Sequence, residues 1–296
     1  MMTKEIRLFF YIALALIAFA GNSILCRLAL AEGLIDPASF TLLRLVSGAF
    51  TLLLLCLFRL AKSTNGGVKN VWQQGSWLSA LALFLYALGF SYAYVSLGTG
   101  LGALILFGAV QLTLILLAIR VGQRLAGLEW LGLAVAFLSF VYLILPSLQG
   151  ESTTAMPLLA VGLMVMAGIA WGAYTWLGKK STSPLFVTTS NFIRTLPMIM
   201  IFIVFIGLEM SLSSLGAIWA ILSGAVMSGL GYALWYALLP QITTTLAAVL
   251  QLLVPVIATI GGVVFASEAV TAHLILASAG VLGGVLMVIL SKRKSA

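Results

Sequence analysis

The chain has 296 residues, of which 62% are hydrophobic and only 7% are charged. Soluble globular proteins carry about 25% charged residues, so this composition excludes a soluble enzyme and a secreted domain. The net charge is +8, but most of the basic residues lie in the short connections between apolar runs. That placement favours a lipid bilayer as the partner and argues against nucleic acid.

Long apolar runs follow one another along the whole chain. They cover residues 8–29, 37–58, 75–97, 100–119, 126–146, 156–178, 184–207, 213–237, 241–266 and 271–290. A bilayer span needs ~20 apolar residues, and a helix satisfies its own backbone hydrogen bonds in lipid. We therefore expect an all-α membrane protein with ten transmembrane helices. The first run comes after two basic residues, Lys4 and Arg7, as the apolar region of a signal peptide does. It is longer than the roughly 7–15 residues of such a region, so we expect it to remain in the protein as a helix.

The charges of the connections test this count. With a cytoplasmic N-terminus, twelve basic residues fall on the inner side: Lys4, Arg7, Arg59, Lys62, Lys69, Arg120, Arg124, Lys179, Lys180, Lys292, Arg293 and Lys294. The opposite connections hold Glu32, Asp36, Glu151, Glu209 and Glu268. Short cytoplasmic loops are enriched in Lys and Arg. We therefore expect both termini in the cytoplasm and the protein in the cytoplasmic (inner or plasma) membrane of a bacterium.

The two halves of the chain, residues 1–148 and 149–296, share a layout. The matched features are Ala20–Ser23 with Trp171–Tyr174, Pro37 with Pro184, Arg44 with Arg194, Gly89–Phe90 with Gly231–Tyr232, and Gln111 with Gln251. A repeated unit with an odd number of helices enters the membrane from the opposite side. We therefore expect two inverted five-helix repeats, with the substrate near the midplane where they meet.

A set of short motifs also carries a family resemblance. The residues concerned are Gly21, Arg27, Pro37, Arg44, Trp171, Gly172, Lys179, Lys180, Pro184, Arg194 and Pro255. Through them the chain resembles the drug/metabolite transporter superfamily, and within it the EamA-type ten-helix exporters. It is most similar to the amino-acid exporters, including those for aromatic amino acids. It departs from the pattern at Ala20, where a tryptophan is common, and at Gln123–Arg124, where an acidic residue is expected.

Two arginines lie inside predicted helices. Arg44 is about 10 Å deep and Arg194 about 15 Å deep at a rise of 1.5 Å per residue. Each side chain either reaches the interface or neighbouring carbonyls as a structural group, or it serves transport. No Asp or Glu lies deep in any predicted helix, which argues against a cation pump and a carboxylate proton relay. A cavity whose fixed charges are arginines suits anionic, zwitterionic or neutral solutes.

Aromatic and neutral polar residues complete the predicted site. Aromatic residues recur at helical spacing, where they either line a cavity or pack against other helices. Buried amides and hydroxyls either join helices or face the same cavity. Gly168 and Gly172, four residues apart, predict a close helix contact. The candidate substrate-binding residues are Asn22, Arg44, Tyr86, Phe90, Gln111, Trp171, Tyr174, Asn191, Arg194, Ser228, Tyr232 and Gln251.

Motifs for catalysis, metal binding or a cofactor are missing from the sequence. The segment Gly172–Ser181 differs from a phosphate-binding loop by an extra lysine and its glycine spacing. We expect a secondary transporter that exports small metabolites, most of all aromatic, hydrophobic and other neutral amino acids, by alternating access. The alternatives are an exporter of another anionic or neutral metabolite or drug, and an intramembrane lipid-modifying enzyme. The oligomeric state stays open, and a monomer is compatible with the sequence.

Overall fold

The computed structural model describes residues 4–61, 71, 73–122, 126–149, 157–178, 181, 183–206, 211–238, 241 and 250–291. Within these ranges the regular elements are helices, apart from an isolated bridge between Ile35 and Leu212. The helices are α1 (Lys4–Leu30), α2 (Pro37–Ala61), α4 (Trp77–Tyr94), α5 (Thr99–Arg120), α6 (Gly127–Gln149), α7 (Leu158–Gly178), α8 (Pro184–Ile206), α9 (Ser214–Leu222), η1 (Ser223–Leu230), α10 (Gly231–Leu238), α12 (Leu253–Ala266) and α13 (Ala272–Ser291).

The described part of the chain forms an all-helical bundle of the kind that crosses a membrane. Seven of its helices are long and apolar enough to span a bilayer, and shorter apolar helices cover Gly127–Ser139, Leu253–Ala266 and Ala272–Val288. Large apolar side chains lie on the outer surface, for example Phe205 and Val204, which are 85% and 77% exposed. Such a surface is suited to lipid rather than to water. Ten spans and cytoplasmic termini stay predictions.

Some predicted features lie outside the described residues. These are Lys62, Lys69, Arg124, Glu151, Lys179, Lys180, Glu209, Lys292, Arg293 and Lys294.

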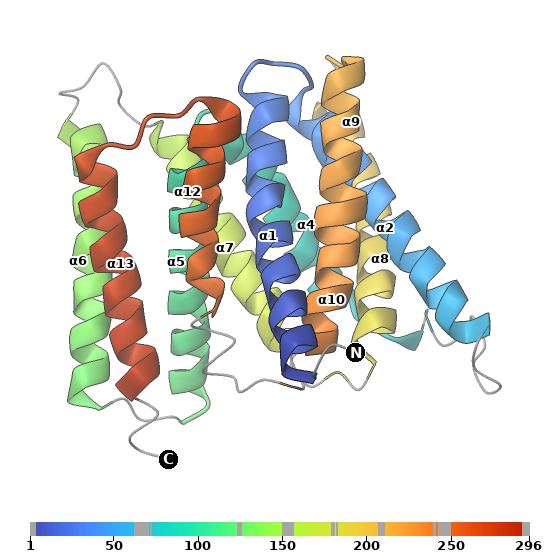
Figure 1. Cartoon of the computed structure of the whole chain (residues 1–296). Coiled ribbons are helices and arrows are strands. Elements are labelled where there is room, and N and C mark those ends of the chain that lie inside the picture. Colours follow the sequence, from blue (N-terminus) through green and yellow to red (C-terminus); the bar gives the residue numbers. More distant parts are fainter. Residues whose placement is uncertain are drawn as a thin grey trace.

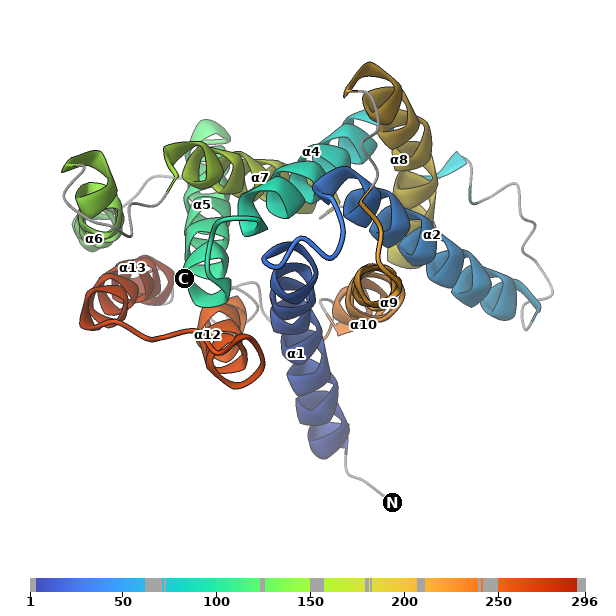
Figure 2. The ribbon, with the colours of Figure 1, turned by 90° about the horizontal axis from the view of Figure 1, so that it is seen from above.

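The helices run alternately up and down, so that α1 begins and α13 ends at the same end of the bundle (Figure 1). Seen from above, α6 and α13 form a pair beside α5 and α12 (Figure 2).

The principal helix contacts come in matched pairs between the part of the chain before residue 149 and the part after it. α1 packs on α12 and on the rod formed by α9, η1 and α10, just as α7 packs on α5 and α4. α2 packs on η1, and α8 packs correspondingly on α4. The pairs α2–α8, α5–α12 and α6–α13 are in direct contact. Each helix of the first part thus makes the same kind of contact as its counterpart in the second part.

Glycines set the closest helix approach around α7. A Cβ atom on Gly168 would lie 2.6 Å from the backbone oxygen of Leu106, and one on Gly172 would lie 2.9 Å from Cβ of Thr113. Both contacts are to α5. The close helix contact that the sequence predicts for this glycine pair is confirmed. It holds the part of α7 that carries Trp171 against α5.

The rod from Ser214 to Leu238 is not a uniform α-helix. The sequence predicts one helix over 213–237, whereas the structure inserts the π-helix η1 at Ser223–Leu230 between α9 and α10. Gly224 of η1 packs against α2 so closely that a Cβ atom there would lie 2.2 Å from the backbone oxygen of Arg44. π-Helical segments occur often at functional sites, and this one leads directly into α10, whose Tyr232 lines the cavity described next.

Candidate functional site

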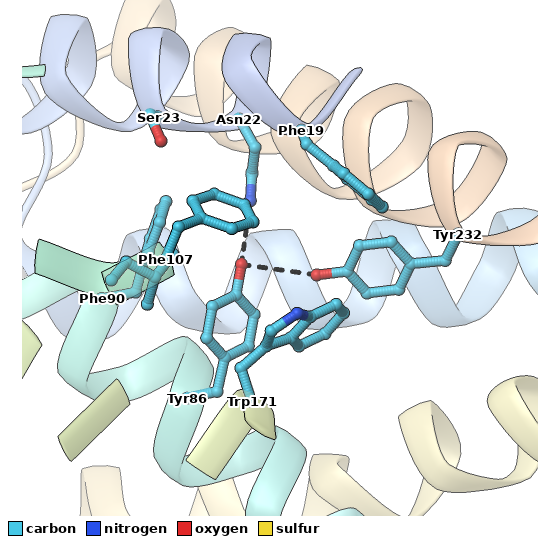
Figure 3. A pocket seen from close by; sticks show the side chains of 9 residues that line it. Phe19, Asn22, Ser23, Tyr86, Phe90, Phe107, Trp171 and Tyr232 are labelled. Atoms are coloured by element: carbon cyan, nitrogen blue, oxygen red, sulfur yellow. Dashed lines mark hydrogen bonds between the residues drawn. The ribbon is translucent and has the colours of Figure 1, made fainter. Parts of the chain in front are cut away.

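A cavity lies between α1, α4, α5, α7 and α10 (Figure 3). Its lining residues are Phe19, Asn22, Ser23, Tyr86, Phe90, Leu106, Phe107, Trp171 and Tyr232, and all of them are buried. The centre of a water-sized sphere can occupy about 20 Å³ of the cavity, whereas one water needs roughly 10–15 Å³ by that measure. The cavity is therefore about the size of a single water, and a larger solute requires side chains of its wall to move.

Aromatic rings form most of the cavity wall. The ring of Trp171 lies 4.8 Å from that of Tyr86 and 4.9 Å from that of Tyr232, between ring centroids. The rings of Tyr86 and Phe90 are 5.5 Å apart. These separations are in the range at which aromatic pairs attract one another. Trp171 of α7 thus joins rings from α4 and α10 into one surface, against which a planar or apolar solute can stack.

The hydroxyl oxygen of Tyr86 is the centre of the polar side of the site. It accepts hydrogen bonds from Nη2 of Arg44 at 2.8 Å, from Nδ2 of Asn22 at 3.2 Å and from the Tyr232 hydroxyl at 3.4 Å. Figure 3 shows the last two of these bonds. A phenol oxygen offers two lone pairs, so the donors around Tyr86 outnumber the acceptor sites that it supplies.

Arg44 lies directly behind this wall and is 2% exposed. Its Nε donates to the Ser228 hydroxyl at 3.2 Å. The guanidinium carbon lies 5.1 Å from the ring centroid of Tyr86 and 4.8 Å from that of Phe90, within cation–π distance. Nη1 has no hydrogen-bond partner among the described residues. Arg44 is therefore a buried cation that touches two lining residues but is not itself part of the lining.

The π-helix η1 supplies two hydroxyls to this cluster. The Ser223 hydroxyl donates to Oδ1 of Asn22, and the Ser228 hydroxyl accepts from Arg44. The two serines are five residues apart, which is the spacing of the π-helical hydrogen bond. In an α-helix, residues at that spacing point about 140° away from each other. The π-helix therefore places both hydroxyls toward the same polar cluster.

Three further predicted site residues do not line the cavity. Tyr174 is buried, and its ring centroid is 5.5 Å from that of Trp171. Gln111 is buried in α5, and its Nε2 has no hydrogen-bond partner among the described residues. Gln251 is buried just before α12. Their roles in substrate binding stay predictions.

Asn191 and Arg194 connect α8 to the segment that leads into α4. Oδ1 of Asn191 accepts a hydrogen bond from the backbone N–H of Ser76 at 3.1 Å. Nη1 of Arg194 donates to the backbone oxygen of Gln74 at 2.8 Å and to the Ser190 hydroxyl. The structure thus groups these two residues with each other and not with the cavity lining. It brings together Asn22, Arg44, Tyr86, Phe90, Trp171, Ser228 and Tyr232 from the predicted set.

Several residues of the site were not predicted from the sequence. Phe19 and Phe107 line the cavity, and Ser223 bonds to Asn22. Helical spacing carries part of the missing signal, because Phe19 precedes Asn22 by three residues and Phe107 precedes Gln111 by four. Nothing comparable in the sequence marks Ser223, because its position depends on the π-helix.

An ion pair joins four helices at the end of the bundle that the sequence predicts to face outside. Nε of Arg27 lies 3.2 Å from Oε1 of Glu268, and Nη1 of Arg27 donates to the backbone oxygens of Tyr94 and Val95. The Glu268 carboxylate accepts from the backbone N–H of Thr99 at 2.8 Å and from its hydroxyl at 3.1 Å. These bonds hold the ends of α1, α4 and α5 to the residues that follow α12.

The described residues offer little for a metal ion. No group of three or more His, Cys, Asp or Glu side chains comes together within them. Cys26 and Cys56 are buried and free. The polar groups that line the cavity are an amide and hydroxyls, and a cation, Arg44, contacts its wall; these groups suit an organic solute with hydrogen-bond acceptors.

Comparisons with known proteins agree with this architecture. Residues 158–290 match the EamA-like transporter family. An uncharacterised Pseudomonas aeruginosa protein is 43% identical over 276 residues, which cover 93% of this chain and 92% of that protein. An Escherichia coli protein named "Probable amino-acid metabolite efflux pump" is 27% identical over 185 residues, 58% of this chain and 61% of that protein.

Two further similarities concern an archaeal relative and the fold. An Archaeoglobus fulgidus protein named "Uncharacterized transporter" is 24% identical over 235 residues, 75% of this chain and 80% of that protein. A solved crystal structure covers 95% of this chain and 99% of its own, with a TM-score of 0.63 and 18% identity, so the two share a fold. A bundle of long apolar helices around a buried cavity, with these relatives, defines a multi-pass membrane transporter rather than an enzyme. Residues 158–290 therefore form an EamA-like transporter family domain, and the transporter names of two relatives support membership in the drug/metabolite transporter superfamily.

Proposed function

We propose that this protein is a secondary transporter that exports small metabolites across the bacterial cytoplasmic membrane. Its substrates are amino acids with aromatic, hydrophobic or other neutral side chains. The observation that carries the proposal is the buried aromatic cavity, which is built by helices from both parts of the chain and has a polar cluster on one side. A cavity of this composition offers stacking for an apolar side chain and hydrogen-bond donors for a polar backbone.

Alternating access follows from two repeats that rock around the cavity. The exchange symmetry of the helix contacts supports two five-helix repeats, with α1 to α6 in the first and α7 to α13 in the second. The basic connections of the sequence support a ten-span topology with cytoplasmic termini. In such a topology the ion pair between Arg27 and Glu268 lies on the outer side of the cavity, where it would have to open to release a solute.

The name of the Escherichia coli relative supports amino acids as the substrate class. The aromatic wall is equally compatible with the alternative substrates, another anionic or neutral metabolite or a planar drug, because stacking does not distinguish among planar solutes. Transport measurements with members of each class therefore decide among them.

The experiment is transport by the purified protein in liposomes. Liposomes are preloaded with radiolabelled phenylalanine, leucine or serine, and efflux is compared with that from protein-free liposomes. We expect protein-dependent efflux that is faster for phenylalanine and leucine than for serine, because the larger apolar side chains cover more of the aromatic wall. Liposomes that retain every amino acid as well as protein-free liposomes do would overturn the amino-acid assignment. Efflux of an anionic metabolite or a planar drug alone would support the alternative.

A further inference from the structure

We propose that Arg44 recognises the carboxylate of the transported solute. This proposal rests on the proposed function and deepens it, because it assigns the substrates to the class of organic carboxylates. It also gives the two sides of the site different tasks. The aromatic wall accommodates the apolar part of the solute, and the cation behind the wall selects solutes that carry an anionic oxygen group.

The buried charge of Arg44 points to an anionic partner. Its side chain is 2% exposed, and a cation removed from water needs a compensating negative charge or a complete set of acceptors. Its hydrogen bonds go to the neutral hydroxyls of Ser228 and Tyr86. The ion pair that the structure shows among the described residues joins Arg27 to Glu268, so no described carboxylate neutralises Arg44.

The guanidinium of Arg44 also has unused hydrogen-bond donors. Nη1 of Arg44 is buried and lacks a hydrogen-bond partner among the described residues. Nη2 shares the Tyr86 hydroxyl with the amide of Asn22 and the hydroxyl of Tyr232. A cluster with more donors than acceptors is completed by a group that only accepts. A carboxylate has two oxygens and pairs with a guanidinium in a planar, bidentate arrangement.

Arg44 contacts the wall of the cavity without lining it. The rings of Tyr86 and Phe90, which line the cavity, lie 5.1 Å and 4.8 Å from its guanidinium carbon. The cavity is too small for an amino acid, at about 20 Å³ for a water-sized sphere, so wall residues must move when a solute enters. Displacement of Tyr86 would enlarge the cavity, uncover Arg44 and remove one of its acceptors. A carboxylate arriving at that moment replaces the lost hydroxyl.

The test measures how well two analogues of phenylalanine compete with phenylalanine for exchange by the protein in liposomes. Protein in liposomes exchanges internal unlabelled phenylalanine for external radiolabelled phenylalanine. The competitors are phenylpropionate, which keeps the carboxylate of phenylalanine, and phenylalaninamide, which has nearly the shape of phenylalanine but an amide in place of the carboxylate. We expect phenylpropionate to compete about tenfold better than phenylalaninamide, because a hydrogen bond to a charged group is roughly twice as strong as a neutral one.

The variant Arg44→Gln is expected to abolish this preference, so that both competitors act equally and weakly. Arg44→Lys keeps the charge but cannot form the bidentate pair, and it is expected to keep part of the preference. The control is Ser47→Ala on the same helix, whose hydroxyl donates to the backbone oxygen of Leu43 at 2.7 Å. This control is expected to discriminate between the competitors like the wild type.

Three results would overturn the proposal. One is wild-type exchange in which phenylalaninamide competes as well as phenylpropionate. Another is an Arg44→Gln protein that still exchanges phenylalanine and still prefers the carboxylate. The third comes from melting temperatures measured in detergent, and it is that neither compound raises the melting temperature of the wild-type protein. The effect of phenylpropionate on the melting temperature is also measured for Arg44→Gln and Arg44→Lys. If no amino acid is exchanged, the proposed function fails, whereas stabilisation by phenylpropionate that is lost in Arg44→Gln still supports carboxylate recognition.

Discussion

Replacing Glu268 by glutamine is expected to weaken the end of the bundle opposite the start of α1 and the end of α13. The carboxylate accepts from the backbone N–H and hydroxyl of Thr99, at the first residue of α5, and lies 3.2 Å from Nε of Arg27. Glutamine has a similar shape, but it removes the negative charge and presents N–H donors to groups that are themselves donors. The substitution therefore removes the ion pair and the interaction with the N-terminal end of the α5 dipole together.

The size of the effect follows from the exposure of the pair. A charge-assisted hydrogen bond contributes about 1.5–3 kcal/mol, and a carboxylate at a helix N-terminus contributes about 0.3–1 kcal/mol. The side chains of Arg27 and Glu268 are 22% and 20% exposed, so solvent screens the pair and lowers its contribution. We expect a loss of about 2 kcal/mol in total, which corresponds to roughly 4 °C in melting temperature.

The assay is thermal unfolding in detergent, followed by tryptophan fluorescence. Arg27→Gln is expected to lower the melting temperature by a similar amount. The double variant should lose less than the two single losses together, because the pair can be broken only once. The control is Glu32→Gln, which alters an exposed carboxylate at the same end of the bundle and should melt like the wild type. Additive losses in the double variant, or a Glu268→Gln protein that melts at the wild-type temperature, would refute this reasoning.

Two further predictions concern packing and transport. Gly224→Ala is expected to cost about 1–3 kcal/mol of stability, since its Cβ would lie 2.2 Å from the backbone oxygen of Arg44. Gly162→Ala, where a Cβ meets nothing within 4 Å, should melt at or slightly above the wild-type temperature; equal melting of the two variants would contradict close packing of η1 on α2. Trp171→Ala is expected to lower phenylalanine efflux about tenfold by removing the ring that joins the wall, whereas Trp130→Ala, at a tryptophan that is 59% exposed, should transport normally.

The two predicted intramembrane arginines show where inference from the sequence ends. Both lie well inside helices, as the count of residues from each helix start predicts. Arg44 meets Tyr86 and Ser228 beside the cavity, whereas Arg194 bonds to the backbone of Gln74 outside α4. Depth along a helix follows from a fixed rise per residue. The direction of a side chain around the helix has no such rule, because it depends on which neighbour packs on which face.

The amino-acid sequence by itself determined the positions of the apolar runs and hence the long helices, since the length and hydropathy of a span are local properties. It also identified most side chains of the polar and aromatic cluster, because an embedded polar group is costly and few are present. Only the tertiary structure decided that Arg44 and Ser228, 184 residues apart, share a hydrogen bond. It also decided that Ser223–Leu230 forms the π-helix η1, which packs tightly on α2. Contacts between distant segments follow from the packing of the whole bundle, which no local pattern records.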